Sequence, residues 1–91
     1  MNIAHQNYIE YLSLGDEFKQ KAETAYENNN YTRAVKYYYN ASLAYEMAKE
    51  IAKEELDVCY RITAGDKEHY CQEKLDELKR FRGISSNEVI R

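Results

Sequence analysis

Small and apolar residues recur at steps of three or four along the first part of the chain. These positions are Ala4, Tyr8, Tyr11, Leu12, Gly15, Phe18, Ala22 and Ala25. Such spacing keeps side chains on one face of an α-helix, so it predicts a helix from about residue 3 to residue 28. Asn28, Asn29 and Asn30 follow. Asparagine tolerates the left-handed backbone conformation, and its side chain competes for backbone hydrogen bonds, so we expect the chain to turn there.

The same spacing continues through the middle of the chain and predicts a second helix from residue 31 or 32 to about residue 63. Its inward positions are Ala34, Tyr38, Ala41, Tyr45, Ala48, Ala52, Leu56 and Cys59. Gly65 and Asp66 are residue types that end one helix and begin the next, so a second turn is expected at residues 63–66. A third helix then runs from about residue 67 to residue 82, with Tyr70, Cys71, Leu75, Leu78 and Phe81 inward.

Three helices joined by two tight turns predict an all-α fold, an antiparallel three-helix bundle with a long central helix. The bundle is expected to span residues 1–83, and residues 84–91 are expected to form a tail or linker. In the first hairpin, facing residues have numbers that sum to about 59 or 60, so Gly15 lies opposite Tyr45. Small residues then face large ones, as interdigitated packing requires.

The second hairpin, folded at Gly65, places Cys59 opposite Cys71. Two facing cysteines can form a disulfide if their α-carbons approach to about 6 Å. The alternative is that both are small, buried, apolar side chains, which is the form that a reducing cytosol favours.

A second apolar row lies outside the inward face of helix two: Tyr39, Leu43, Met47 and Ile51. Steps of four residues keep these side chains on one side of the helix. A helical hairpin cannot bury both rows, so the third helix or a partner must cover the outer one. We therefore expect Tyr39, Leu43, Met47 and Ile51 to bind a partner, which is a protein, a peptide or a second copy of this chain.

The composition narrows the function further. A length of 91 residues allows one domain, and the absence of proline with only three glycines is typical of a helical chain. The net charge of −3 offers no basic face, so nucleic-acid binding is not expected. No apolar run reaches the roughly 18 to 20 residues of a membrane span, and no signal-peptide pattern opens the chain, so a cytoplasmic location is expected. Glu46 with Lys49, and Glu50 with Lys53, are spaced as exposed helical ion pairs.

No set of residues predicts an enzyme, a metal site or a cofactor. His69 and Cys71 lie two positions apart on a helix and point in nearly opposite directions, so one metal ion cannot easily use both. The HEPN nuclease signature needs a histidine within a few residues of an arginine, whereas Arg61 and His69 are eight apart. A HEPN-like, nucleic-acid-associated protein is therefore the least favoured alternative, behind a homo-oligomeric structural helical protein.

The first hairpin resembles a tetratricopeptide-repeat hairpin. The likeness rests on the alanines and tyrosines around the turn: Ala22, Ala25, Tyr31, Ala34, Tyr38 and Ala41. A single repeat is seldom stable, and no second copy of the pattern is present. One such hairpin followed by a third helix resembles the MIT (microtubule interacting and trafficking) domain, over about residues 8–82. That resemblance implies a three-helix bundle that binds short helical or extended partner segments in grooves between its helices.

Overall fold

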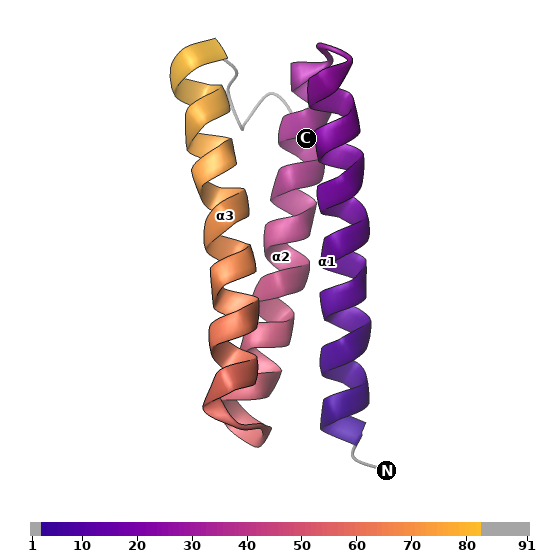
Figure 1. The fold of residues 1–91 in the computed structure, drawn as a ribbon, viewed down its shortest axis with the longest axis vertical. Helices are drawn as coiled ribbons and strands as arrows, with labels where there is room; N and C mark the ends of the chain where they lie inside the picture. Colours follow the sequence, from indigo (N-terminus) through magenta and orange to yellow (C-terminus); the bar gives the residue numbers. More distant parts are fainter. Residues whose placement is uncertain (1–2, 83–91) are drawn as a thin grey trace.

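The chain folds as three antiparallel α-helices: α1 (Ile3–Glu27), α2 (Tyr31–Glu55) and α3 (Val58–Arg82), each 25 residues long. The structure is a computed structural model that describes residues 3–82. α1 and α3 both pack against α2, one on each side (Figure 1). The predicted all-α, antiparallel three-helix bundle is confirmed, but its central helix is no longer than the other two. The predicted tail at residues 84–91 and the predicted inward side chain of Phe81 lie outside the part that the structure describes.

The first turn lies at the three asparagines, as the sequence predicts. Asn29 adopts a positive φ of 61°, the left-handed conformation that asparagine tolerates better than most residues. The Asn30 side chain caps α2 by accepting a hydrogen bond from the Arg33 backbone N–H at 3.2 Å. The Asn30 N–H in turn donates to the carbonyl of Ala25 at 2.8 Å. The asparagines thus satisfy backbone groups that the two helix ends leave without partners.

The second turn is not where the sequence predicts it. α2 ends at Glu55 rather than near residue 63, and Gly65 lies inside α3. Leu56 leaves the helix in an extended conformation, with φ −126° and ψ 174°. Asp57, a residue type that favours helix starts, precedes α3 and its carbonyl accepts the Tyr60 N–H at 3.1 Å.

The length of the third helix explains this difference. A glycine inside a helix is unfavourable by only about 1 kcal/mol relative to alanine. A turn near residue 57 gives α3 the full 25 residues, so that it covers α2 from end to end. Along those extra turns Ala64 is fully buried and Tyr60 packs against the same core cluster, and we infer that this packing offsets the preference of one glycine.

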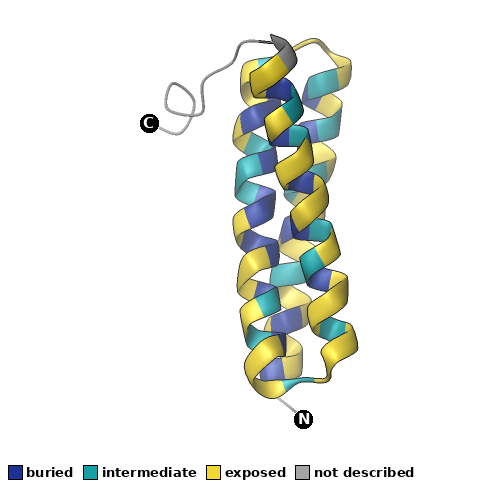
Figure 2. Ribbon diagram, turned by 90° about the vertical axis from the view of Figure 1, so that its left-hand side faces the viewer, coloured by how far each residue is buried: buried dark blue, intermediate teal, exposed yellow. Residues whose placement is uncertain are grey.

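The core runs along the inward side of α2 (Figure 2). Most of the buried residues of this helix are small: Ala34, Ala41, Ser42, Ala44, Ala48 and Ala52, together with Val35, Tyr38 and Tyr45. Gly15 of α1 packs against the ring of Tyr45, which confirms the predicted register of the first hairpin. Ala64 of α3 joins Ala52 in one core cluster, and Cys71 joins Tyr45 in the other, so α3 runs antiparallel to α2.

Long side chains connect α1 and α3. The Tyr8 hydroxyl donates to the carbonyl of Tyr60 at 2.9 Å, and Lys67 Nζ lies 3.1 Å from a carboxylate oxygen of Asp16. These contacts close the bundle on the side away from Leu43 and Met47 of α2. Within residues 3–82, no helix is both long enough and apolar enough to cross a membrane.

Candidate functional site

The predicted outer row of α2 is exposed at its centre and packed at its ends. Leu43 is 42% exposed and Met47 is 47% exposed, and the two lie one helical turn apart on the same side of α2. Tyr39 is half-buried against one core cluster, and Ile51 is half-buried against the other. The structure therefore keeps all four residues on one face, and it leaves Leu43 and Met47 as the pair that a partner can cover.

Leu14 of α1 extends this face, and sequence reasoning missed it. Its side chain is 40% exposed. Gly15 faces Tyr45, and Asp16 points toward Lys67 of α3. Because successive helical residues are about 100° apart, Leu14 points the opposite way from Asp16, toward the side of the bundle with the outer face of α2. The sequence did contain a sign of this position, because the predicted pairing of Gly15 with Tyr45 puts Leu14 at the same level along the bundle as the outer row of α2.

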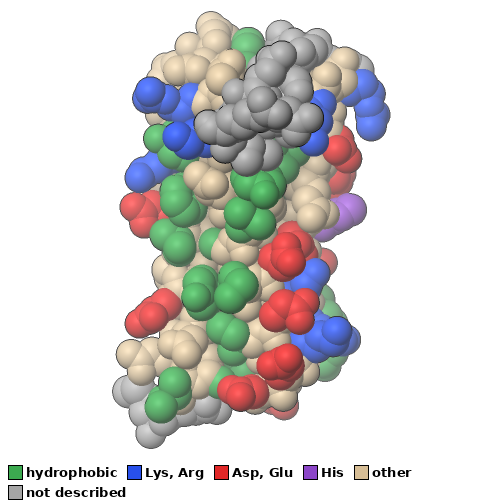
Figure 3. Space-filling model, turned by 180° about the vertical axis from the view of Figure 1, so that it is seen from behind, with side chains coloured by type: hydrophobic (Ala, Val, Ile, Leu, Met, Phe, Trp, Pro, Cys, Tyr) green, Lys and Arg blue, Asp and Glu red, His purple; other side chains and the backbone are tan. Residues whose placement is uncertain are grey.

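We call the surface formed by Leu14, Tyr39, Leu43, Met47 and Ile51 the outer face. Seen from behind, the molecule shows hydrophobic side chains gathered along the middle of α2 (Figure 3). Lysine and arginine side chains lie mainly at the upper end of this view and again at the lower right, where they alternate with carboxylates. The surface around the apolar centre is thus more basic at its upper end and more acidic lower down.

The ion pairs explain why these charges remain available. Lys49 was expected to pair with Glu46 along the helix, but its Nζ lies 2.7 Å from the carboxylate of Glu68 on α3. The hydrogen bond that Lys49 donates to the Glu68 carboxylate raises the pKa of Lys49, although partial burial opposes the shift. Among residues 3–82, Glu46 and Glu50 form no ion pair, since the salt bridges lie elsewhere. Carboxylates beside the apolar centre are therefore free to meet a cationic partner.

A network behind the outer face holds α2 rigidly at the level of Leu43 and Met47. The Tyr45 side chain is fully buried, and its hydroxyl donates to the Asp16 carboxylate. Burial, with this hydrogen bond second, raises the pKa of Tyr45 far above its ordinary value. Lys67 Nζ contacts Asp16 at 3.1 Å and lies 5.7 Å from the centre of the Tyr45 ring. Three helices are thus joined at one level, so the outer face is preformed rather than shaped on binding.

The predicted facing of Cys59 and Cys71 across the second turn is wrong, and the possible disulfide between them goes with it. Both cysteines lie in α3, twelve positions apart, which separates them by about 18 Å along the helix axis. A disulfide needs α-carbons within about 7 Å. Cys59 is exposed and Cys71 is buried, and both are free. Burial raises the pKa of Cys71 to about 11, so it packs as a neutral thiol. The physical cause of the error is the second turn, which lies before Cys59 rather than between the two cysteines.

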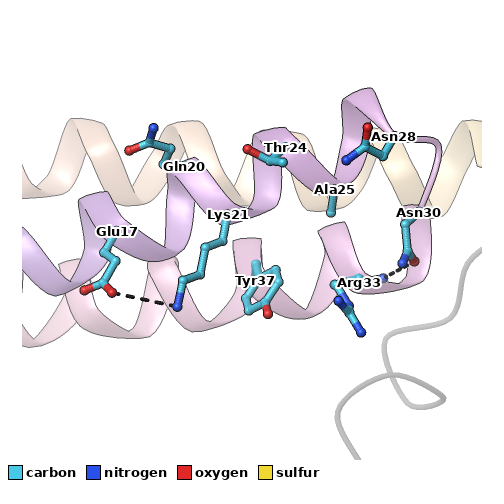
Figure 4. Close-up of a pocket in the computed structure, with 9 residues that line it drawn as sticks. All are labelled: Glu17, Gln20, Lys21, Thr24, Ala25, Asn28, Asn30, Arg33 and Tyr37. Atoms are coloured by element: carbon cyan, nitrogen blue, oxygen red, sulfur yellow. Dashed lines mark hydrogen bonds and ion pairs between the residues drawn. The ribbon is translucent and has the colours of Figure 1, made fainter.

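A separate hollow of about 530 Å³ lies beside the first turn (Figure 4). It is lined by Glu17, Gln20, Lys21, Thr24, Ala25, Asn28, Asn30, Arg33 and Tyr37. Glu17 and Lys21 pair with each other across one helical turn, at 3.7 Å between carboxylate oxygen and Nζ. The hollow is open, most of its lining residues are of polar types, and it contains none of the five residues of the outer face.

Other side chains that bear chemistry are dispersed. His69 and Glu73 form an exposed pair, with 3.0 Å between Nε2 and the carboxylate oxygen. Within the described residues, no group of three or more histidine, cysteine, aspartate or glutamate side chains is placed to hold a metal ion. Comparisons of the chain with protein-family models, curated proteins and solved structures gave no match.

Proposed function

We propose that this chain is a cytoplasmic protein-interaction module, without an enzymatic activity or a cofactor of its own. Its outer face receives a helix or a short peptide segment of a partner protein. The observation that carries the proposal is the exposure of two large apolar side chains, Leu43 and Met47, one helical turn apart on the side of α2 that α1 and α3 leave uncovered. The resemblance of the first hairpin with its following third helix to the MIT domain supports the same kind of function.

The energetics of the outer face suit this role. Full burial of a leucine or methionine side chain contributes about 1.5–3 kcal/mol, and Leu14, Leu43 and Met47 each keep 40–47% of their surface exposed. A partner helix with apolar residues spaced three and four apart can cover all three at once. Because the network around Tyr45 already fixes α2, little conformational entropy is lost when the partner binds.

Replacing both Leu43 and Met47 with aspartate should abolish partner capture while leaving the bundle folded. The new carboxylates would lose their hydration against an apolar partner, which is strongly unfavourable. The measurement is an affinity pull-down from lysate of the source organism, with wild type and variant compared at equal amounts and the fold of each confirmed by circular dichroism.

A matched control carries the same two charges elsewhere. Gln20 and Thr24 are exposed on α1 and line the hollow near the first turn. The Gln20→Asp/Thr24→Asp variant should capture the same proteins as wild type. Loss of capture in this control, with capture retained by the Leu43→Asp/Met47→Asp variant, would move the binding site to the hollow and contradict the proposal.

A further inference from the structure

The exposed charges on the side of α2 that carries Leu43 and Met47 change sign along the helix, whereas Lys53 points away from this side. Arg33 and Lys36 lie in its first half, and Glu50 and Glu54 lie in its second half. All four residues are exposed, and within residues 3–82 none of the four forms a side-chain ion pair. Leu43 and Met47 lie between the two charged groups. A partner that suits this surface must therefore be acidic at one end, apolar in the middle and basic at the other end.

The outer face of α2 itself has this pattern when its direction is reversed. If a second α2 lies antiparallel to the first and residue 45 marks the centre, facing residues have numbers that sum to 90. Leu43 then lies opposite Met47, and Tyr39 lies opposite Ile51. Lys36 lies opposite Glu54 at both ends of the contact. The apolar residues thus share levels with apolar residues, and Lys36 shares a level with Glu54. Arg33 lies at the level of Asp57, which follows α2, and Glu50 lies at the level of the uncharged Asn40.

We propose that the partner on the outer face is a second copy of this chain, docked with α2 antiparallel to α2 about a two-fold axis at the level of Tyr45. The proposal rests on the proposed function of the outer face and names its occupant. A two-fold axis makes the interface self-complementary, because residue i of one copy meets residue j of the other and the reverse. A parallel arrangement would instead place Lys36 on Lys36 and Glu54 on Glu54.

Leu14 supports the position of the axis. A two-fold axis that lies in the interface and crosses α2 at right angles brings α1 of one copy beside α1 of the other. Gly15 packs against Tyr45, so Leu14 lies within one residue of the level of the axis. The two Leu14 side chains therefore meet near the centre of the dimer. Leu14, Leu43 and Met47 of both copies form one apolar centre with charged ends.

The size of the contact predicts a weak dimer. α2 has 25 residues and is therefore about 37 Å long. A contact strip about 10 Å wide along it would cover roughly 370 Å² on each copy, and α1 adds the region around Leu14. Stable complexes bury about 800 Å² on each partner. We therefore expect dissociation at micromolar to millimolar concentrations, with a strong dependence on salt because the end contacts are exposed.

Two charge reversals test this arrangement. Lys36 and Glu54 are eighteen positions apart in one α2, or about 27 Å, so they cannot pair within one chain. In a homodimer of the Lys36→Glu variant, both end contacts bring two carboxylates together. In a homodimer of the Glu54→Lys variant, both end contacts bring two ammonium groups together. Each variant alone should dimerise about 5- to 30-fold more weakly than wild type. The two variants mixed should form a heterodimer, because both of its end contacts are again opposite in charge.

The dissociation constants are measured by sedimentation equilibrium at low ionic strength, from about 1 µM to 1 mM protein. Isotope labelling of one variant allows the heterodimer to be counted by native mass spectrometry. The double variant Lys36→Glu/Glu54→Lys should dimerise like wild type. Glu27→Lys is the control, because Glu27 is exposed at the end of α1 and lies off the outer face, and it should also match wild type.

The outcomes separate this proposal from the proposed function. Recovery in the mixture and in the double variant supports the antiparallel dimer. Wild type that stays monomeric up to 1 mM, or single variants that weaken the dimer without recovery in the mixture, would overturn it. In either of those cases the outer face remains a protein-binding site if the Leu43→Asp/Met47→Asp variant still loses its captured proteins, and it is no binding site if that variant captures what wild type captures.

Discussion

Replacing Tyr45 with alanine should lower the free energy of unfolding by about 3–5 kcal/mol, the range observed when a large aromatic side chain is removed from a core. Tyr45 is fully buried between Gly15 of α1 and residues of α3, and it holds Asp16 and Lys67 through its hydroxyl and its ring. Small domains are stable by only about 5–15 kcal/mol, so this loss is a large share of the total. Urea denaturation followed by circular dichroism measures it.

Tyr45→Phe is the matched control for the ring. It keeps the aromatic volume and removes only the hydrogen bond to Asp16, which contributes about 0.5–3 kcal/mol because the acceptor is a carboxylate. We expect the phenylalanine variant to be clearly more stable than the alanine variant. Equal losses in the two variants would show that the hydroxyl, rather than the ring, connects the three helices.

Replacing Gly15 with alanine should lower the free energy of unfolding by about 1–2 kcal/mol, although alanine is the better helix former. A Cβ at position 15 would lie 2.5 Å from Cε1 and 2.6 Å from Cδ1 of the Tyr45 ring. Overpacking of this kind is unfavourable by about 1–3 kcal/mol, and the gain in helix propensity offsets up to about 1 kcal/mol of it. The Tyr45 ring cannot move aside freely because its hydroxyl is bonded to Asp16.

The Gly65→Ala variant separates the gain in helix propensity from the overpacking against Tyr45. Gly65 lies inside α3, and a Cβ there would meet only the Cδ of Lys49 at 3.6 Å, an ordinary contact. This variant should be more stable than wild type by about 0.5–1 kcal/mol. Both free energies come from chemical denaturation at one low protein concentration. The contact between Gly15 and Tyr45 would be disproved if both alanine variants stabilised the fold equally.

The sequence predicted the first hairpin well because its signals are local. Three asparagines mark the turn, and the packing of Gly15 against Tyr45 determines how the two helices align. The second turn has a weaker signal, since Asp57 is its one residue that favours a helix start and residues 54–58 contain neither glycine nor proline. Gly65 was the stronger local sign. Tertiary packing overrode it, because a longer α3 covers the whole of α2.

The outer face could be predicted only in part. The spacing of Leu43 and Met47 showed a second apolar row, but the half-burial of Tyr39 and Ile51 depends on side chains from the neighbouring helices. Leu14 lies next to the inward row of α1 in sequence. It can be assigned to the outer face only once the contact between Gly15 and Tyr45 shows how α1 is rotated about its own axis. The error with the cysteines has one cause, the position of the second turn.

The most direct test of the account compares two leucine-to-alanine variants of the dilute monomer by chemical denaturation. Leu43 is 42% exposed on the outer face, whereas Leu78 is 1% exposed in the core. If the outer face serves binding rather than folding, Leu43→Ala lowers the free energy of unfolding by less than about 1 kcal/mol, and Leu78→Ala lowers it by about 2–5 kcal/mol. Equal losses would place Leu43 in the core and contradict the account.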